Sequence, residues 1–296
     1  MTQQTSPMTG VEAYTPAEVA RLVETRGVTK ARGAFVPTFA LGVLAGAFIA
    51  LGAALSTVVG TGSALGFGPT RWLAGLAFSV GLILVVVAGA ELFTGNNLVV
   101  MSLVDRHITT AQLLRNWAVV FAGNFVGAIS VVVLVWLGDG WTFGGEEVGV
   151  SALSIAATKT SLPFEVVFVR GILCNVLVCL AVWLAMAGRT VVDKVFAIMF
   201  PIAAFVAVGF EHSIANMYFI PQGMLIKGED DLQAKAIAAG ITPELLSSLD
   251  VSGFLNNLAA ATLGNIVGGG VLVGLVYWFV YLRPNRATRN TSSTAE

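Results

Sequence analysis

Two short polar motifs interrupt apolar runs of this chain, and together they carry side chains suited to anion and proton chemistry. Residues 89–96 read Gly-Ala-Glu-Leu-Phe-Thr-Gly-Asn and residues 209–216 read Gly-Phe-Glu-His-Ser-Ile-Ala-Asn, so both have the form Gly-x-Glu-x-x-x-x-Asn. His212 lies in the second motif, and an imidazole changes its charge between about pH 5 and 8. Thr94 lies in the first motif and offers a neutral hydrogen-bonding hydroxyl. Such a pair could orient a small anion and supply or stabilise a proton.

The competing interpretation of His212 is structural, since a single histidine in an apolar span is more often a hydrogen-bonded packing residue. Because His212 sits in a motif that the chain repeats, we favour the functional interpretation. A haem between spans would need a second axial ligand, and the other histidine, His107, falls in a loop. No nucleophile, metal-ligand cluster or phosphate-binding loop indicates an enzyme, a metal site or a cofactor.

The elements that must carry these motifs are membrane helices. Of the 296 residues, 56% are hydrophobic and 11% are charged, against about 25% charged residues in soluble domains. A hydrocarbon core of about 30 Å needs about 20 apolar residues per helix. The formal net charge of -1 gives no reason to expect a nucleic-acid partner. Six runs have the required length, at residues 38–59, 72–93, 113–138, 163–187, 195–220 and 254–281.

Six spans place both termini on one side of the membrane, and the basic residues indicate which side. Eleven of the 16 Lys and Arg residues fall on the side of the termini. Four fall in the opposite loops: Arg71, Lys159, Lys227 and Lys235. The positive-inside rule therefore predicts cytoplasmic termini. We expect residues 1–33 to form a cytoplasmic segment without a signal peptide, residues 34–283 the six-span domain, and residues 284–296 a cytoplasmic tail.

The N-terminal segment contains the pattern of a short amphipathic helix. Thr15 and Glu18 have the spacing of a capping box, with a proline at the first helical position. Gly27 sits where a C-terminal cap would end the helix. The apolar face, with Val19 and Val23, should pack against the membrane domain.

The polar motifs belong to a longer internal repeat. Residues 116–127 and 257–268 share Asn-x6-Gly-Asn-x-Val-Gly, in the third and sixth spans. Each half holds three spans, so the second copy enters the membrane from the opposite side and the repeat is inverted. Inverted repeats of this kind are typical of transporters and channels, whose substrate site lies near the midplane and is lined by interrupted helices.

The repeated residues have two expected roles. Small and polar residues at Leu92–Asn97 and His212–Asn216 should break the second and fifth spans, because such residues continue a helix poorly and line a cavity well. Asn124 and Asn265 should hydrogen-bond to the broken segments, beside glycines that let helices approach closely. The supporting residues of the two copies are Glu91, Glu211, Asn96, Asn216, Asn124 and Asn265.

Two charges and two cysteines fall inside the fourth span. Charges at that depth usually face protein, and Glu165 and Arg170 are too far apart to stack on one helical face. We expect them to form structural ion pairs with other helices rather than to contact substrate. Cys174 and Cys179 lack metal-ligand spacing and are interpreted as small core residues.

Residues 88–96, 170–183, 209–217 and 264–270 closely resemble the formate/nitrite transporter family. The resemblance covers nearly the whole chain after about residue 15. It implies an all-α membrane protein with an aquaporin-like protomer, a homopentamer with one pore in each protomer, and passage of small monovalent anions or their conjugate acids. No Asn-Pro-Ala motif occurs, which argues against a water or glycerol channel.

Carried over residue by residue, the resemblance implies a substrate pathway and two apolar constrictions. His212 matches a central pore histidine, Thr94 a polar contact of the first broken segment, Asn175 a nearby pore asparagine and Lys159 a basic residue of the outer vestibule. The constrictions are expected at Phe78, Leu82, Leu92, Phe93 and Phe205.

We therefore expect a channel or transporter in the cytoplasmic (inner) membrane of a bacterium or archaeon. An apolar constriction disfavours a bare anion, so passage should depend on pH or be coupled to protons. The first motif resembles that of the family's formate carriers, which implies formate as substrate, with nitrite, hydrosulfide or short carboxylates as alternatives. A secondary transporter with large rocking motions remains a rival mechanism, and saturable flux would indicate it.

Overall fold

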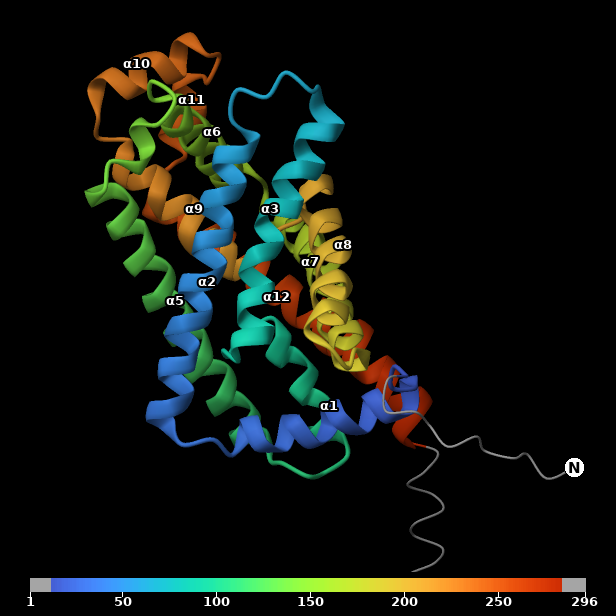
Figure 1. The fold of residues 1–296 in the computed structure, drawn as a ribbon. Coiled ribbons are helices and arrows are strands. Elements are labelled where there is room, and N and C mark those ends of the chain that lie inside the picture. Colours follow the sequence, from blue (N-terminus) through green and yellow to red (C-terminus); the bar gives the residue numbers. More distant parts are fainter. Residues whose placement is uncertain (1–11, 284–296) are drawn as a thin grey trace, which may run out of the picture.

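The computed structural model describes residues 12–283, and within these residues the chain is all-helical (Figure 1). Six helical segments of this part are long and apolar enough to cross a membrane. They are α2 (Phe35–Gly60), α3 (Phe67–Ala88), α5 (Thr110–Leu137), α7 (Phe164–Ala187), α8 (Val191–Val208) and a sixth span formed by α12 (Val251–Asn265) with the π-helical stretches η3 (Ile266–Leu275) and η4 (Trp278–Leu282). The shorter elements are α1 (Pro16–Ala31), η1 (Gly95–Val99), α4 (Val100–Val104), η2 (Gly140–Thr142), α6 (Glu147–Ser161), α9 (Ser213–Ile226), α10 (Asp230–Ala238) and α11 (Pro243–Ser247).

The expected six-span fold with broken second and fifth spans is confirmed, but the breaks begin earlier than expected. Helix α3 ends at Ala88 and α8 ends at Val208. The C-cap residues that follow, Gly89 (φ +86°) and Gly209 (φ +84°), have the left-handed conformation that glycine adopts without steric cost. The glycine of each repeated motif is therefore a helix terminator. Residues after each break are helical again, so the prediction of a loop over His212–Asn216 was wrong beyond His212.

The two halves pack through the same pairs of elements. Helix α2 lies against α5 in the first half, and α7 lies against α12 in the second. A Cβ atom at Gly127 would lie 1.9 Å from the carbonyl oxygen of Val43, and one at Gly268 would lie 2.1 Å from that of Ile172. The repeated glycines thus allow backbone contact between helices, as expected of small residues at such crossings.

Helix α1 lies across one end of the bundle, next to the C-terminal end of the sixth span, whereas α10 and α11 cover the opposite end together with α6 (Figure 1). Thr15 and Glu18 form the predicted capping box, and the hydrogen bonds from Thr15 lower the pKa of Glu18. Val19 and Val23 are buried against the membrane helices, as predicted. Residues 1–11 and 284–296, which include the expected C-terminal tail, lie outside the described residues.

The prediction that Gly27 ends this helix was wrong. Helix α1 continues to Ala31 and has its C-cap at Arg32. A Cβ atom at Gly27 would lie 2.2 Å from Ser102 Oγ. The glycine is therefore used for a close approach to α4, where Ser102 donates a hydrogen bond to the Glu24 carbonyl oxygen at 2.7 Å.

Replacing Gly127 with alanine should destabilise the bundle, because the added methyl group collides with backbone that cannot turn aside. We expect the free energy of unfolding to fall by about 1–3 kcal/mol, measured as a lower thermal unfolding midpoint in detergent. Gly68→Ala is the matched control, since nothing lies within 4 Å of its Cβ position. Equal midpoints for the two variants would contradict the packing role.

Candidate functional site

A hydrogen-bonding contact between two side chains joins the two broken segments. Thr94 Oγ1 lies 3.0 Å from His212 Nε2, and both residues are buried. His212 is also the N-cap of α9, because its Nδ1 accepts a hydrogen bond from the backbone N–H of Ala215 at 3.0 Å. Since Nδ1 is held as an acceptor, the proton of the neutral ring is on Nε2, which therefore donates to Thr94.

Asn124 satisfies the backbone of the first break. Its Oδ1 accepts the N–H of Phe93 at 2.9 Å, and its Nδ2 donates to the carbonyl oxygens of Gly42 at 2.8 Å and Glu91 at 2.9 Å. The asparagine is fully buried on α5. It ties α2 to peptide groups that have lost their helical partners at the break.

Asn265 makes the equivalent bonds in the second half. Its Oδ1 accepts the N–H of Ser213 at 2.9 Å, and its Nδ2 donates to the carbonyl oxygens of Gly171 at 2.8 Å and Glu211 at 3.0 Å. The hydrogen bonds that we expected from these two asparagines to the broken segments are present. Water is scarce at this depth of a membrane, so protein groups must supply the hydrogen bonds that the broken segments need.

A charged network anchors the first break to α1. Lys30 Nζ lies 3.0 Å from Glu91 Oε1 and donates to Asn96 Oδ1 at 2.8 Å. Asn96 donates to Glu91 Oε2 at 2.6 Å and to Asn116 Oδ1 at 3.0 Å. Asn116 closes the network by donating to the carbonyl oxygen of Lys30 at 3.0 Å.

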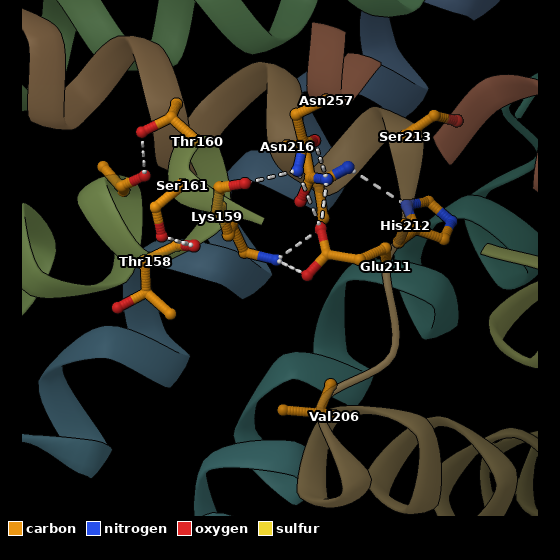
Figure 2. Close-up of polar contacts among 12 residues, drawn as sticks. Thr158, Lys159, Thr160, Ser161, Val206, Glu211, His212, Ser213, Asn216 and Asn257 are labelled. Atoms are coloured by element: carbon orange, nitrogen blue, oxygen red, sulfur yellow. Dashed lines mark hydrogen bonds and ion pairs between the residues drawn. The ribbon is translucent and has the colours of Figure 1, made fainter. Parts of the chain in front are cut away.

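The second break carries a closely similar network, shown in Figure 2. Lys159 Nζ donates to both oxygens of Glu211, at 3.0 and 3.1 Å. Asn216 donates to Glu211 Oε2 at 2.7 Å and to Asn257 Oδ1 at 2.6 Å, and Asn257 donates to the carbonyl oxygen of Lys159 at 2.9 Å. Glu211 is 3% exposed, so this is a buried ion pair with hydrogen bonds to the rest of its carboxylate.

The matching networks show that α1 and α6 are equivalent elements, which the sequence analysis missed. Lys159 was placed in a loop, but it lies in the last turn of α6. A signal was available: Thr-Lys occurs at residues 29–30 and again at 158–159, and each lysine is 12 residues before Gly42 or Gly171 (42 - 30 = 171 - 159). The repeat therefore includes the short helix that precedes each set of three spans.

Two cavities approach the Thr94–His212 contact from opposite ends. The α1-side cavity, of about 210 Å³, is lined by residues of α1 and of the first break and reaches Leu82 and Leu92. The α6-side cavity, of about 440 Å³, is lined by residues of α6 and of the second break and reaches His212. Phe78 and Phe205 also line the α6-side cavity, with their ring centroids 5.5 Å apart.

Three of the residues expected along the pathway line neither of these two cavities within the described part of the chain: Thr94, Asn175 and Phe93. Thr94 is nevertheless in contact with His212. Asn175 Nδ2 donates to Asn97 Oδ1 and to the Asn265 carbonyl oxygen, each at 2.7 Å, so this asparagine joins the two halves.

The Phe93 ring packs against aromatic side chains of α5. Its ring centroid lies 5.0 Å from that of Phe121 and 6.0 Å from that of Trp117, both at steep interplanar angles. Edge-to-face contacts of this kind stabilise aromatic packing. The geometry therefore favours a packing role for Phe93.

Comparison with known proteins decides the family. The profile described as Formate/nitrite transporter matches residues 17–279, which is most of the chain. The chain belongs to the formate/nitrite transporter family. The suspected resemblance is thereby confirmed, and the protein is a membrane transport protein of this family, not an enzyme.

Relatives in the family cover almost the same length. The protein is 43% identical over 275 residues to the Formate channel FocA of Escherichia coli (strain K12), with 91% of this chain and 95% of the relative covered. It is 37% identical to the Probable formate transporter of Methanothermobacter thermautotrophicus, with 93% and 99% covered. Among solved structures, it is similar to the "Pentameric formate channel with formate bound", with TM-score 0.74, 39% identity, and 84% and 98% covered.

Breaking the buried pair in the second half should destabilise this transporter. Glu211→Gln leaves Lys159 without its counter-charge, and we expect a loss of about 3–5 kcal/mol in the free energy of unfolding. Thermal unfolding in detergent measures it, and adding Lys159→Met should restore part of the loss. Lys235→Met is the control, because the Lys235–Glu146 pair is exposed and worth about 1 kcal/mol or less. A Glu211→Gln variant no less stable than this control would contradict the anchoring role.

Proposed function

We propose that this member of the formate/nitrite transporter family is a channel for small monovalent anions, with formate as its main substrate. The observation that carries the proposal is the contact between Thr94 and His212, which places two hydrogen-bonding groups between cavities that open toward opposite ends. Formate is favoured because several relatives are named formate channels and one similar structure has formate bound. Nitrite, hydrosulfide and short carboxylates are the alternatives within the same framework.

The path between the cavities favours the protonated acid over the anion. Leu82 and Leu92 close the α1-side cavity, and Phe78 and Phe205 stand beside His212 in the α6-side cavity. A bare anion would lose its hydration between these apolar side chains, and that loss is costly in a low-dielectric interior. The neutral acid avoids most of this cost, so a proton accompanies each formate that passes.

His212 and Thr94 act in this proposal as hydrogen-bond donors at the midpoint. Protonation of His212 at Nδ1 would remove the acceptor that caps Ala215, so the neutral ring with its proton on Nε2 fits the site. Thr94 accepts that Nε2–H, which leaves its own hydroxyl hydrogen to donate to an oxygen of the passing acid or anion. The pair would orient the substrate while water delivers the proton.

Orientation and assembly follow from charge distribution and from the family. We infer that the end covered by α1 is cytoplasmic, because most basic residues lie on that side, and that the protein resides in the cytoplasmic membrane of a bacterium or archaeon. A homopentamer with one pore in each protomer is the assembly we propose, by similarity to the pentameric formate channel. Many large apolar side chains on the spans are exposed in the single protomer and suit contact with lipid or neighbouring protomers.

Replacing His212 with asparagine tests the midpoint role. Asparagine is a good N-cap residue, so the start of α9 should survive, but the imidazole N–H is lost. In proteoliposomes we expect formate flux to fall about tenfold, the loss of one hydrogen bond in a buried site, while the flux still rises as the pH falls. Measured rates for formate, nitrite, hydrosulfide, acetate and lactate would rank the substrates. Flux that no longer depends on pH in His212→Asn would mean that the proton passes through the ring itself, and a wild-type protein that carries no formate would overturn the proposed substrate.

A further inference from the structure

The α6-side cavity is lined by more basic side chains than the one that its ion pair contains. Three basic residues line it, Arg71, Lys159 and Arg170, together with one carboxylate, that of Glu211. A cavity within a membrane domain is a low-dielectric setting in which one uncompensated charge strongly affects the distribution of ions. Only a cation that the protein leaves unpaired is available to an anion in this cavity.

Lys159 and Arg71 are both engaged by the protein. The Lys159 ammonium group binds both oxygens of Glu211, so the pair is close to neutral as seen from the cavity. Arg71 donates from Nε to the carbonyl oxygen of Ala207 at 3.2 Å and from Nη2 to that of Val206. These carbonyls lie at the C-terminal end of α8, where a cation satisfies acceptors that the helix leaves open.

Arg170 differs from both. It is half-buried on α7, and within residues 12–283 its guanidinium has no ion pair and no hydrogen bond. The structural ion pairs that we expected for Arg170 and Glu165 were wrong, since neither has one in this part of the chain and Glu165 is exposed. A guanidinium at this depth is retained against a cost, and a cavity that admits water and anions reduces that cost.

Comparison of the two halves of the repeat separates the role of the Arg170 backbone from that of its side chain. The carbonyl oxygen of Arg170 accepts the N–H of Glu211 at 3.3 Å, and the carbonyl oxygen of Leu41 accepts the N–H of Glu91 at 3.1 Å. Leu41 is thus the counterpart of Arg170 in the first half. The fold requires the peptide group at this position and is satisfied by leucine, so the guanidinium is not needed to hold the break.

We propose that Arg170 is an anion-binding site in the α6-side cavity, for small planar oxyanions such as formate or nitrite. A guanidinium offers two parallel N–H donors that match the two oxygens of such an anion. The anion collects there before it is protonated and passes Phe78 and Phe205, so Arg170 sets the affinity for substrate that enters from this end. This inference rests on the proposed function for the identity of the substrate, but the binding site can be tested without transport.

The test compares Arg170→Leu, which copies the residue of the first half, with Arg170→Lys and Glu165→Gln. Glu165→Gln changes a charge on the same helix outside the cavity. Formate uptake is measured from the α6 side in oriented proteoliposomes as a function of concentration. For Arg170→Leu we expect the uptake rate at low formate concentration to fall about tenfold or more, as for the loss of a charge-assisted hydrogen-bonded pair. Arg170→Lys should recover part of the affinity, because it restores the charge without the paired donors.

A binding assay separates failure of this inference from failure of the proposed function. Sodium formate and sodium nitrite should raise the thermal unfolding midpoint of the wild-type protein and of Glu165→Gln, but not that of Arg170→Leu, because a ligand stabilises the state that binds it. If the wild-type protein bound these anions through Arg170 and transported none, the proposed function would be wrong and the site would stand. If Arg170→Leu kept the wild-type uptake rate at low formate concentration, or kept the same anion-dependent stabilisation, the inference would be overturned.

Discussion

The fold depends on supplying hydrogen bonds to peptide groups, and partners to charges, in the middle of a membrane. Two spans stop at Gly89 and Gly209, and the chain that follows exposes peptide groups that lipid cannot hydrogen-bond. Asn124 and Asn265 meet this need from the third and sixth spans by making the same three bonds each. Because these bonds fix where each break lies, they also fix where the side chains of the breaks point.

The charged networks extend the same solution to the two ends of the molecule. Each break carries a glutamate, buried at Glu211 and half-buried at Glu91. Each glutamate is paired with a lysine from a short helix that lies outside the set of spans, α1 in one half and α6 in the other. The two halves differ at positions whose side chains are not needed to hold the breaks. Thr94 stands opposite His212, and Leu41 stands where the other half has Arg170. Such differences between otherwise matching halves are where we place substrate chemistry.

Much of the fold could be predicted from the sequence, and the predictions that were wrong or missing have physical causes. The apolar runs gave the spans, and the repeated motifs gave the breaks and their asparagines. The equivalence of α1 and α6 was hidden because these helices share little beyond a Thr-Lys pair. Gly27 was misassigned because glycine serves both helix ends and close helix contacts. The engagement of Lys159 and the turning of Phe93 toward α5 depend on how distant helices meet, which spacing along one helix does not reveal.

If unsatisfied charge is what the fold avoids, then the proposed substrate should cross the centre as a neutral acid. Membrane potential and internal pH, recorded together in proteoliposomes under an imposed formate gradient and compared with protein-free vesicles, test this most directly. We expect formate entry to acidify the interior and to generate no potential, so that clamping the potential leaves the rate unchanged. Formate entry that makes the interior electrically negative without acidifying it would show instead that the bare anion crosses the centre.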